Sequence, residues 1–318
     1  MAGGSSAPDF ITLYMFTGGL ETFKCHGLPT NCHLPTTNCP LYSLFLRNMP
    51  QQSTANISIE SHTITSEFLG REVKIDFYIP TQQKQQQELS LLLVNDGQDL
   101  QTMHFEEILD ELYEEDAISN LLCVGIHCSK DRKNEYGTAG TLDYKGRGAR
   151  AALYNKFIFE ELMPFVRSSL LIYSFKEKSF AGFSLGGLSA LDMVWNHPQE
   201  FTKVGVFSGS MWWRDRDQDD PAFDEETDRI MHRQVKEGGY FPWLKFFFEV
   251  GTFDEVADRN NNGIIDSIDD TQSLVAELVS KGYSRENDIR FIELKNGKHD
   301  VPTWAKAFPE FLKWGWGR

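Results

Sequence analysis

The sequence predicts an α/β fold in which a doubly wound, mostly parallel sheet carries helices on both faces. Short, continuous apolar runs are typical of strands buried on both faces of a parallel sheet. Segments with helical spacing alternate with these runs, as in successive βαβ units. The predicted strands are residues 73–79, 89–94, 121–126, 180–183, 204–207, 246–250 and 289–294. The predicted helices lie at about 100–115, 150–168, 186–197, 270–281 and 303–315.

The domain organisation follows from a change in composition near residue 60. Residues 1–60 are rich in Gly, Ser, Thr, Pro and Asn and show no sustained periodicity, so we expect an irregular, poorly ordered N-terminal extension. Cys25, Cys32 and Cys39 recur there at a spacing that does not suit a structural zinc site. Residues 61–318 are predicted to form one α/β domain.

Charge and hydropathy exclude several classes of protein. The chain has 31 basic against 46 acidic residues and a formal net charge of -15, which argues against a nucleic-acid partner and an anionic membrane surface. No apolar run approaches the roughly 20 residues that a membrane-spanning helix needs. The first residues do not resemble a secretory signal, so we expect a cytoplasmic protein. The oligomeric state is not predicted.

Residues 182–186 read Gly-Phe-Ser-Leu-Gly and match the nucleophile-elbow pattern G-x-S-x-G. In that motif a sharp turn from strand to helix holds the serine in a strained conformation, and glycine is needed on both sides because side chains would clash. A predicted strand precedes Ser184 and a helical pattern follows it. We therefore expect Ser184 to be a nucleophile, the alternative being a glycine-rich turn without chemistry.

A serine nucleophile of this type needs an acid and a histidine base, in the chain order Ser, Asp or Glu, His. His299 follows a predicted strand and precedes a helix, where a base can reach Ser184. His232 lies in a charged, helical stretch and is expected at the surface. The acid should follow the preceding strand and is predicted as Asp254, with the adjacent Glu255 left open.

Stabilising the reaction's oxyanion needs two backbone N–H groups. The first candidate is Leu185, which follows the nucleophile. The second is Gln98, which closes the segment Asn-Asp-Gly-Gln after the strand at 89–94. On its own, the Asp-Gly pair in that segment predicts only a turn.

Residues 258–269, Asp-Arg-Asn-Asn-Asn-Gly-Ile-Ile-Asp-Ser-Ile-Asp, match a calcium-binding loop of the EF-hand type. The predicted Ca²⁺ ligands are the side chains of Asp258, Asn260, Asn262, Asp266 and Asp269 and the backbone carbonyl of Ile264. The last position holds Asp instead of the usual Glu, so a modest affinity is expected. Because the loop begins four residues after Asp254, the ion's expected role is structural, and a polar loop held by Asx turns is the alternative.

Together these motifs resemble the putative-esterase family that includes esterase D, enterochelin esterases, feruloyl and acetyl-xylan esterases and the mycolyltransferases. The resemblance covers about residues 65–318. The segments that carry it are 95–98 (Asn-Asp-Gly-Gln), 181–187 (Ala-Gly-Phe-Ser-Leu-Gly-Gly), 207–213 (Phe-Ser-Gly-Ser-Met-Trp-Trp), 251–254 (Gly-Thr-Phe-Asp), 134–137 (Asn-Glu-Tyr-Gly) and 143–147 (Asp-Tyr-Lys-Gly-Arg).

The resemblance implies an α/β-hydrolase fold with little or no cap domain, and it supports the triad and oxyanion donors named above. It also suggests that Trp212 and Trp213 lie near the acyl or alcohol pocket, although core packing is an equal alternative for a tandem Trp. Residues 1–60 do not resemble the N-terminal domain of enterochelin esterases, which puts siderophore hydrolysis in doubt.

These observations predict a serine carboxylic-ester hydrolase that works through an acyl-enzyme. Its substrate is expected to be a small-molecule ester of the enterochelin-esterase, feruloyl-esterase or acetyl-esterase type. Two alternatives stay open. One is a non-catalytic, calcium-stabilised binding protein on the same fold, and the other is a serine peptidase.

Overall fold

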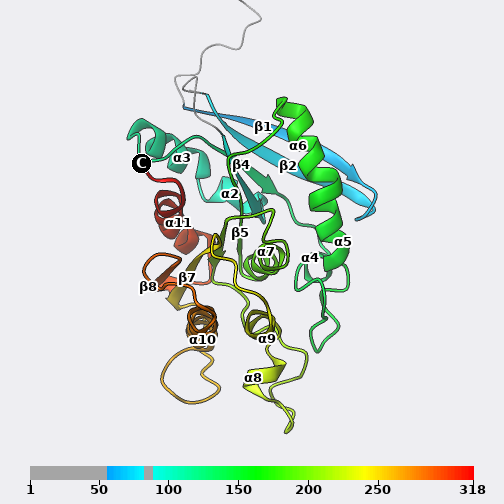
Figure 1. Cartoon of the computed structure of the whole chain (residues 1–318), viewed down its shortest axis with the longest axis vertical. Coiled ribbons are helices and arrows are strands. Elements are labelled where there is room, and N and C mark those ends of the chain that lie inside the picture. The colour runs from blue at the N-terminus through cyan, green and yellow to red at the C-terminus, as the bar shows by residue number, and fades with distance from the viewer. Residues whose placement is uncertain (1–55, 82–88) are drawn as a thin grey trace, which may run out of the picture. The chain divides into compact units, whose positions relative to one another are not determined.

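The computed structural model describes residues 56–81 and 89–318. Within them one eight-stranded sheet has the order β1-β2-β4-β3-β5-β6-β7-β8 (Figure 1). The strands are β1 (Ile57–Ser66), β2 (Arg71–Pro80), β3 (Ser90–Asn95), β4 (Leu121–Ile126), β5 (Lys178–Phe183), β6 (Lys203–Phe207), β7 (Lys245–Phe253) and β8 (Ile289–Lys298). The pairs β1–β2 and β2–β4 are antiparallel, and every pair from β4 to β8 is parallel. The predicted doubly wound, mostly parallel sheet is confirmed.

Helices cover both faces of this sheet and form a separate apolar core with each face. They are α2 (Gln98–Thr102), α3 (Phe105–Glu114), α4 (Arg132–Glu135), α5 (Ala151–Lys156), the π-helix η1 (Phe157–Leu162), α6 (Met163–Leu170), α7 (Leu185–Asn196), α8 (Glu225–Asp228), α9 (Ile230–Glu237), α10 (Asp266–Lys281) and α11 (Val301–Trp316). Side chains of α5, η1, α6, α7, α9 and α10 belong to one core. Side chains of α2, α3 and α11 belong to the other. The central strands β3 and β4 are therefore buried on both faces, as their apolar sequences predict.

Strand β1 was not among the predicted strands. Its sequence, Ile-Ser-Ile-Glu-Ser-His-Thr-Ile-Thr-Ser, is mostly polar and largely exposed because it forms one edge of the sheet. The strand begins at Ile57, before the expected domain start at residue 61. The predicted N-terminal extension and its cysteines lie, except for its last few residues, outside the described part of the chain.

Helix α9 lies in the stretch expected to be helical, but the expectation that His232 lies at the surface was wrong. His232 is only 3% exposed, because Ile230, Met231 and Val235 of the same short helix pack into the core. Its Nε2 lies 2.9 Å from the Asp270 carbonyl oxygen on α10. Burial lowers the pKa of His232 to about 3, so the ring is neutral.

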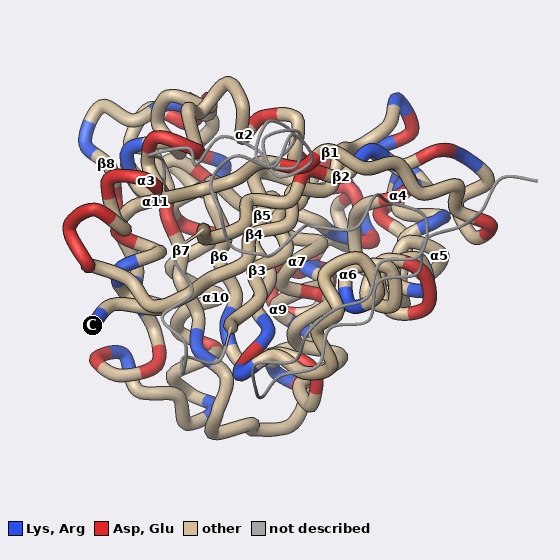
Figure 2. The backbone as a smooth tube through the Cα atoms, turned by 90° about the horizontal axis from the view of Figure 1, so that it is seen from above, with Lys and Arg blue, Asp and Glu red and all other residues tan. Residues whose placement is uncertain are grey.

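Acidic and basic positions are interspersed over the surface elements (Figure 2). The central strands β3 and β4 contain no charged residue. In the part of the chain that the structure describes, no helix is long and apolar enough to cross a membrane.

Candidate active site

Ser184 stands at the carboxyl end of β5, where the chain turns sharply into α7. Its backbone angles, φ 53° and ψ -122°, lie in a region that a residue with a side chain rarely adopts. The Ser184 N–H donates to the carbonyl oxygen of Phe207 (2.8 Å), and the Ser184 carbonyl accepts from the N–H of Ser210 (3.2 Å). The strained turn is therefore fixed by the adjacent end of β6.

The glycines beside Ser184 are required by close backbone contacts. A Cβ atom on Gly182 would lie 2.4 Å from the Gly186 carbonyl oxygen. A Cβ atom on Gly186 would lie 2.4 Å from Oδ2 of Asp96, in the turn after β3. Both distances are shorter than any tolerable contact, so the elbow packs without room for side chains at these two positions.

Both predicted oxyanion donors are the first residues of helices. Leu185 opens α7 and Gln98 opens α2, so each N–H is among those that have no acceptor within its own helix. The two helix starts are joined by Asn95, whose Nδ2 donates to the Gly186 carbonyl oxygen (2.8 Å). The turn that precedes Gln98 therefore lies next to the turn that contains Ser184.

Arg132 is a site residue that the sequence did not single out. Its guanidinium holds Asp96 with two bonds, from Nε to Oδ1 (2.7 Å) and from Nη2 to Oδ2 (2.6 Å). Nη2 also donates to the carbonyl oxygen of Phe183, directly before the serine (3.1 Å). Arg132 therefore ties the two halves of the candidate oxyanion site together, and only a tertiary contact reveals it.

The acid and base candidates meet at the carboxyl ends of β7 and β8. Nδ1 of His299 lies 3.4 Å from Oδ2 of Asp254, at the long end of hydrogen-bond geometry. The His299 side chain is 41% exposed and that of Asp254 only 1%, so the carboxylate lies beneath an accessible imidazole. Oδ1 of Asp254 accepts from the N–H of Gly251 (3.2 Å), which fixes its orientation.

Trp304, near the start of α11, connects this pair to the nucleophile strand. Its ring lies edge-on to His299 at 5.5 Å and stacks on Phe183 at 5.0 Å. Its Nε1 donates to the Ser208 hydroxyl (2.9 Å). Among the described residues no hydrogen bond joins the Ser184 hydroxyl to His299. Trp304 connects them indirectly, because it contacts both His299 and Phe183, the residue before Ser184.

The alternative acid, Glu255, faces away from His299. Its Oε1 accepts the N–H of Ser267 at the start of α10 (2.6 Å). Burial raises the pKa of Glu255. The geometry favours Asp254 as the partner of His299 and gives Glu255 a role in anchoring the 258–269 loop.

The two tryptophans expected near the substrate differ in burial. Trp213 is fully buried, and its ring fills the space left by Gly137, where a Cβ would lie 2.7 Å from Cζ2. The Trp213 ring therefore packs in the core, as the alternative for the tandem Trp describes. Trp212 is half-buried, with the guanidinium of Arg147 4.9 Å from its ring centre, and retains an accessible surface.

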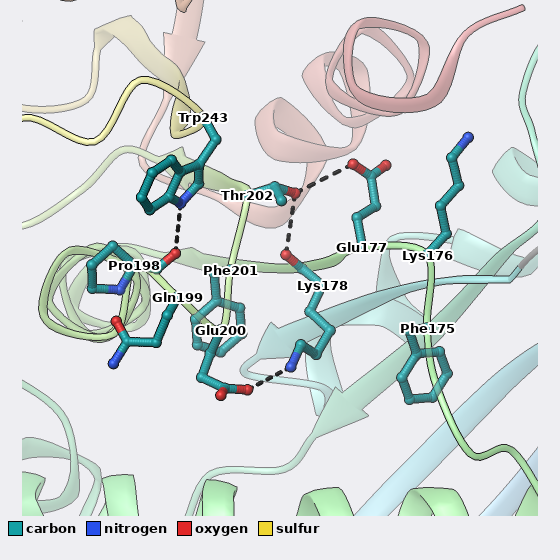
Figure 3. A pocket seen from close by; sticks show the side chains of 10 residues that line it. All are labelled: Phe175, Lys176, Glu177, Lys178, Pro198, Gln199, Glu200, Phe201, Thr202 and Trp243. Carbon is teal, nitrogen blue, oxygen red and sulfur yellow. Dashed lines mark hydrogen bonds and ion pairs between the residues drawn. The ribbon is translucent and has the colours of Figure 1, made fainter.

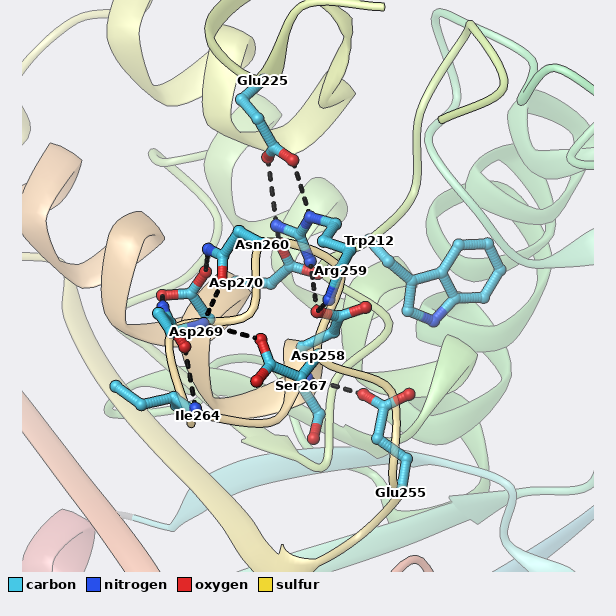
Figure 4. A network of polar contacts seen from close by, with 12 residues as sticks. Trp212, Glu225, Glu255, Asp258, Arg259, Asn260, Ile264, Ser267, Asp269 and Asp270 are labelled. Carbon is cyan, nitrogen blue, oxygen red and sulfur yellow. Dashed lines mark hydrogen bonds and ion pairs between the residues drawn. The ribbon is translucent and has the colours of Figure 1, made fainter. Parts of the chain in front are cut away.

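The predicted calcium ligands form a compact polar loop (Figure 4). Nδ2 of Asn260 and Nδ2 of Asn262 lie 3.0 and 3.4 Å from the two carboxylate oxygens of Asp269. The carboxylate of Asp258 accepts the N–H groups of Asn262 (3.1 Å) and Gly263 (2.9 Å). Positions 1, 3, 5 and 12 of the motif are thus brought together.

The ninth position, Asp266, is turned towards Arg259 instead. Its Oδ1 accepts the Arg259 N–H (2.8 Å) and lies 3.2 Å from the Arg259 guanidinium. Ile264 has its N–H on Oδ1 of Asn262 (2.8 Å), and its side chain is exposed. In the part of the chain described, no group of three His, Cys, Asp or Glu is arranged to hold a metal; the predicted set relies on asparagine oxygens.

A pocket of about 290 Å³ lies at the amino ends of β5 and β6 (Figure 3). Its lining includes Lys178 and Thr202, which stand where β5 and β6 begin, whereas Ser184 follows the end of β5. Lys178 pairs with Glu200 (2.5 Å) across it. This hollow is therefore separate from the candidate active site.

Comparison with known proteins gives a family match. The model of a family described as putative esterase matches residues 66–314. An uncharacterized protein of Bacillus subtilis (strain 168), YbbA, is 23% identical over 220 residues, which cover 67% of this chain and 80% of that protein.

Solved structures of esterases share the fold. The enterobactin esterase FES from Shigella flexneri, solved with 2,3-di-hydroxy-N-benzoyl-glycine, is 21% identical with a TM-score of 0.60, covering 82% of this chain and 60% of that one. This chain therefore spans about 60% of the length of that enzyme. A ferulic acid esterase is 16% identical with a TM-score of 0.60, covering 82% of this chain and 98% of that one. An IroE-like serine hydrolase from Shewanella oneidensis is 20% identical with a TM-score of 0.59, covering 81% and 79% of the two chains.

Proposed function

The chain belongs to the putative esterase family, and we propose that it acts as a serine esterase with Ser184, His299 and Asp254 as its triad. One observation carries the proposal. A serine in a strained turn between β5 and α7 lies at the same carboxyl end of the sheet as a buried carboxylate that faces an exposed imidazole.

The mechanism follows from the placement of these groups. His299 takes the proton from the Ser184 hydroxyl as its oxygen attacks the ester carbonyl carbon. The N–H groups of Leu185 and Gln98 donate to the oxyanion that forms. His299, held by Asp254, then protonates the leaving alcohol. Water attacks the acyl-enzyme by the same route and frees the carboxylic acid and Ser184.

We propose a small-molecule ester as the substrate, with an acyl part that carries an aromatic ring, such as a feruloyl or an N-dihydroxybenzoyl-aminoacyl group. The related structures include a ferulic acid esterase and an enterobactin esterase solved with a dihydroxybenzoyl compound. The half-buried ring of Trp212 supports an aromatic ligand, since stacking of aromatic rings favours such contacts.

The test compares wild type with Ser184→Ala on short p-nitrophenyl esters, methyl ferulate and an N-dihydroxybenzoyl-serine ester. We expect Ser184→Ala to lose about 10⁴-fold or more in kcat/KM and to resist labelling by a fluorophosphonate. Ser280→Ala, an exposed serine of α10, is the matched control and should behave as wild type. Labelling of Ser184→Ala to the same extent as wild type would contradict the proposal.

We further propose that the 258–269 loop binds Ca²⁺ in a structural role. Hydrogen bonds hold Asp258, Asn260, Asn262 and Asp269 in one loop, in which the amide nitrogens of the two asparagines face Asp269. The residue types support the proposal, because calcium takes carboxylate and amide oxygens. Asp266 is the departure, since it pairs with Arg259. A bound ion would hold the loop that begins four residues after Asp254 and take no part in the chemistry.

A further inference from the structure

Glu249, in the middle of β7, is a buried acid that the mechanism above does not use. Its side chain is 0% exposed, and neither carboxyl oxygen has a hydrogen-bond partner among the described residues. Unpartnered charge is costly to bury, so an orphan of this kind calls for a physical explanation.

The position of Glu249 places it beside the catalytic acid. Successive residues of a strand point to opposite faces, so Glu249 and Gly251 share one face of β7. A Cβ on Gly251 would lie 2.7 Å from Oδ1 of Asp254, so the Asp254 carboxyl lies over that face at the position of Gly251. The two carboxyl groups are thus about one two-residue step of the strand, roughly 7 Å, apart.

The surroundings of Glu249 offer no cation. Its neighbours in register are Phe207 on β6 and Ile292 on β8. The N–H of Ser208 donates to the backbone carbonyl of Glu249 (2.7 Å), and it lowers the pKa of the carboxyl by less than burial and Asp254 raise it. Among the described residues, Asp254 is the one charged group that acts on the Glu249 carboxyl.

Two buried carboxyl groups this close do not both ionise readily, and the member without donors keeps the proton. Asp254 has the Gly251 N–H and His299 as partners, whereas among the described residues no group lies within hydrogen-bond geometry of the Glu249 carboxyl and no cation acts on it. Burial, and then the negative charge of Asp254, raise the pKa of Glu249 to about 8.

We propose that Glu249 and Asp254 form a carboxyl pair that carries one negative charge, in which Glu249 holds the proton and takes over the charge when Asp254 is neutralised. Glu249 is then a positioning residue, which acts on His299 through the negative charge that it shares with Asp254. The role of Glu249 in supporting His299 rests on the proposed triad, whereas the protonation state of Glu249 is independent of it.

The first experiment measures protonation without any assay of activity. Infrared spectra of protein labelled with ¹³C-glutamate should show, at pH 7, a protonated-carboxyl band that disappears in Glu249→Gln and titrates away above about pH 8. Glu293→Gln on the neighbouring strand, where the carboxyl is exposed, is the matched control and should keep the band. Because the pH titration uses wild type alone, a band absent at pH 7 overturns the proposal even if Glu249→Gln fails to fold.

The second experiment is a double-mutant cycle on kcat/KM with a p-nitrophenyl ester. Glu249→Gln alone should cost at most about threefold and leave the acid limb of the pH profile in place, because the group it replaces is already neutral. In the Asp254→Asn background the same change should cost at least about tenfold more, because Glu249 then supplies the charge that supports the imidazolium.

Two outcomes of the cycle would overturn the proposal that Glu249 and Asp254 share one negative charge. One is an equal effect of Glu249→Gln in both backgrounds. The other is a downward shift of the acid limb in Glu249→Gln, which shows an ionised Glu249 in wild type. Failure of the proposed function is recognised separately, as wild type without Ser184-dependent hydrolysis, and leaves the infrared result valid.

Discussion

The Ser184 turn and the 258–269 loop are both short motifs with glycine at a fixed position, yet their geometry is held in opposite ways. The Ser184 turn is fixed by close packing, since Gly182 and Gly186 contact other backbone or buried atoms. The loop is exposed and held by its own side chains, and a Cβ on Gly263 would meet nothing within 4 Å. A motif embedded in the sheet thus depends on tertiary contacts, whereas a surface loop depends on local hydrogen bonds and on any ion it binds.

The largest effect expected at the packed site comes from removing its base. His299→Ala should lower kcat/KM by about 10⁴-fold, because neither proton transfer then has a carrier. His104→Ala, an exposed histidine in the turn between α2 and α3, is the control. Steady-state kinetics with a p-nitrophenyl ester measure both, and near-normal turnover in His299→Ala would remove His299 from the triad.

Glycine substitutions test the comparison directly. Gly182→Ala should cost about 3 kcal/mol of unfolding free energy, because its Cβ meets the Gly186 carbonyl oxygen at 2.4 Å and the backbone has to shift. Gly263→Ala should cost about 1–2 kcal/mol, since its positive φ of 83° is the only obstacle. Urea denaturation measures both, and equal costs would contradict the contrast between the two regions.

Calcium should stabilise the loop and leave the chemistry unchanged. At an ion concentration of about 100 times the dissociation constant, unfolding should become harder by about 2.7 kcal/mol. Asp269→Ala should abolish this gain, and Asp219→Ala, an exposed acid outside the loop, should not. Thermal melting with and without chelator makes the measurement; an equal gain in Asp269→Ala would rule out the predicted ligand set.

The smallest effect concerns His232, which binds the start of α10 behind the loop. Its folded pKa of about 3 lies below the unfolded value of about 6.5, so the unfolded chain binds more protons in between. Its contribution to the free energy of unfolding is therefore complete above about pH 6.5 and falls as the pH falls, by about 2 kcal/mol at pH 5.

His232→Gln should lose this part of the pH dependence. Urea denaturation of wild type and variant at pH 7 and pH 5 makes the measurement. The exposed His104→Gln is the matched control. An unchanged slope between the two pH values in His232→Gln would show that the ring is accessible to protons.

The sequence predicted the elements whose signal is local. Apolar runs identified seven strands, and the elbow pattern located Ser184 because its glycines are demanded by the turn itself. Edge strand β1 was missed because its residues are mostly polar and exposed. The burial of His232 was missed because charged residues surround it in the sequence, whereas Ile230, Met231 and Val235 pack the helix into the core.

The parts of the site that escaped prediction depend on residues distant in the chain. Arg132 binds Asp96 across 36 positions and the Phe183 carbonyl across 51, and no sequence spacing encodes either contact. Glu249 reads locally as one polar residue in an apolar strand; its significance comes from the fold of Asp254 back onto the same face. The choice between Asp254 and Glu255 likewise needed the direction of each side chain.

Trp304 touches the base, the nucleophile strand and the turn after β6 with a single side chain. Because α11 begins two residues after His299, a displacement of its first turn moves all three together. We therefore expect little change in the spacing between His299 and the end of β5 when this turn moves. The indole thus couples the position of His299 to the strand that ends at the nucleophile.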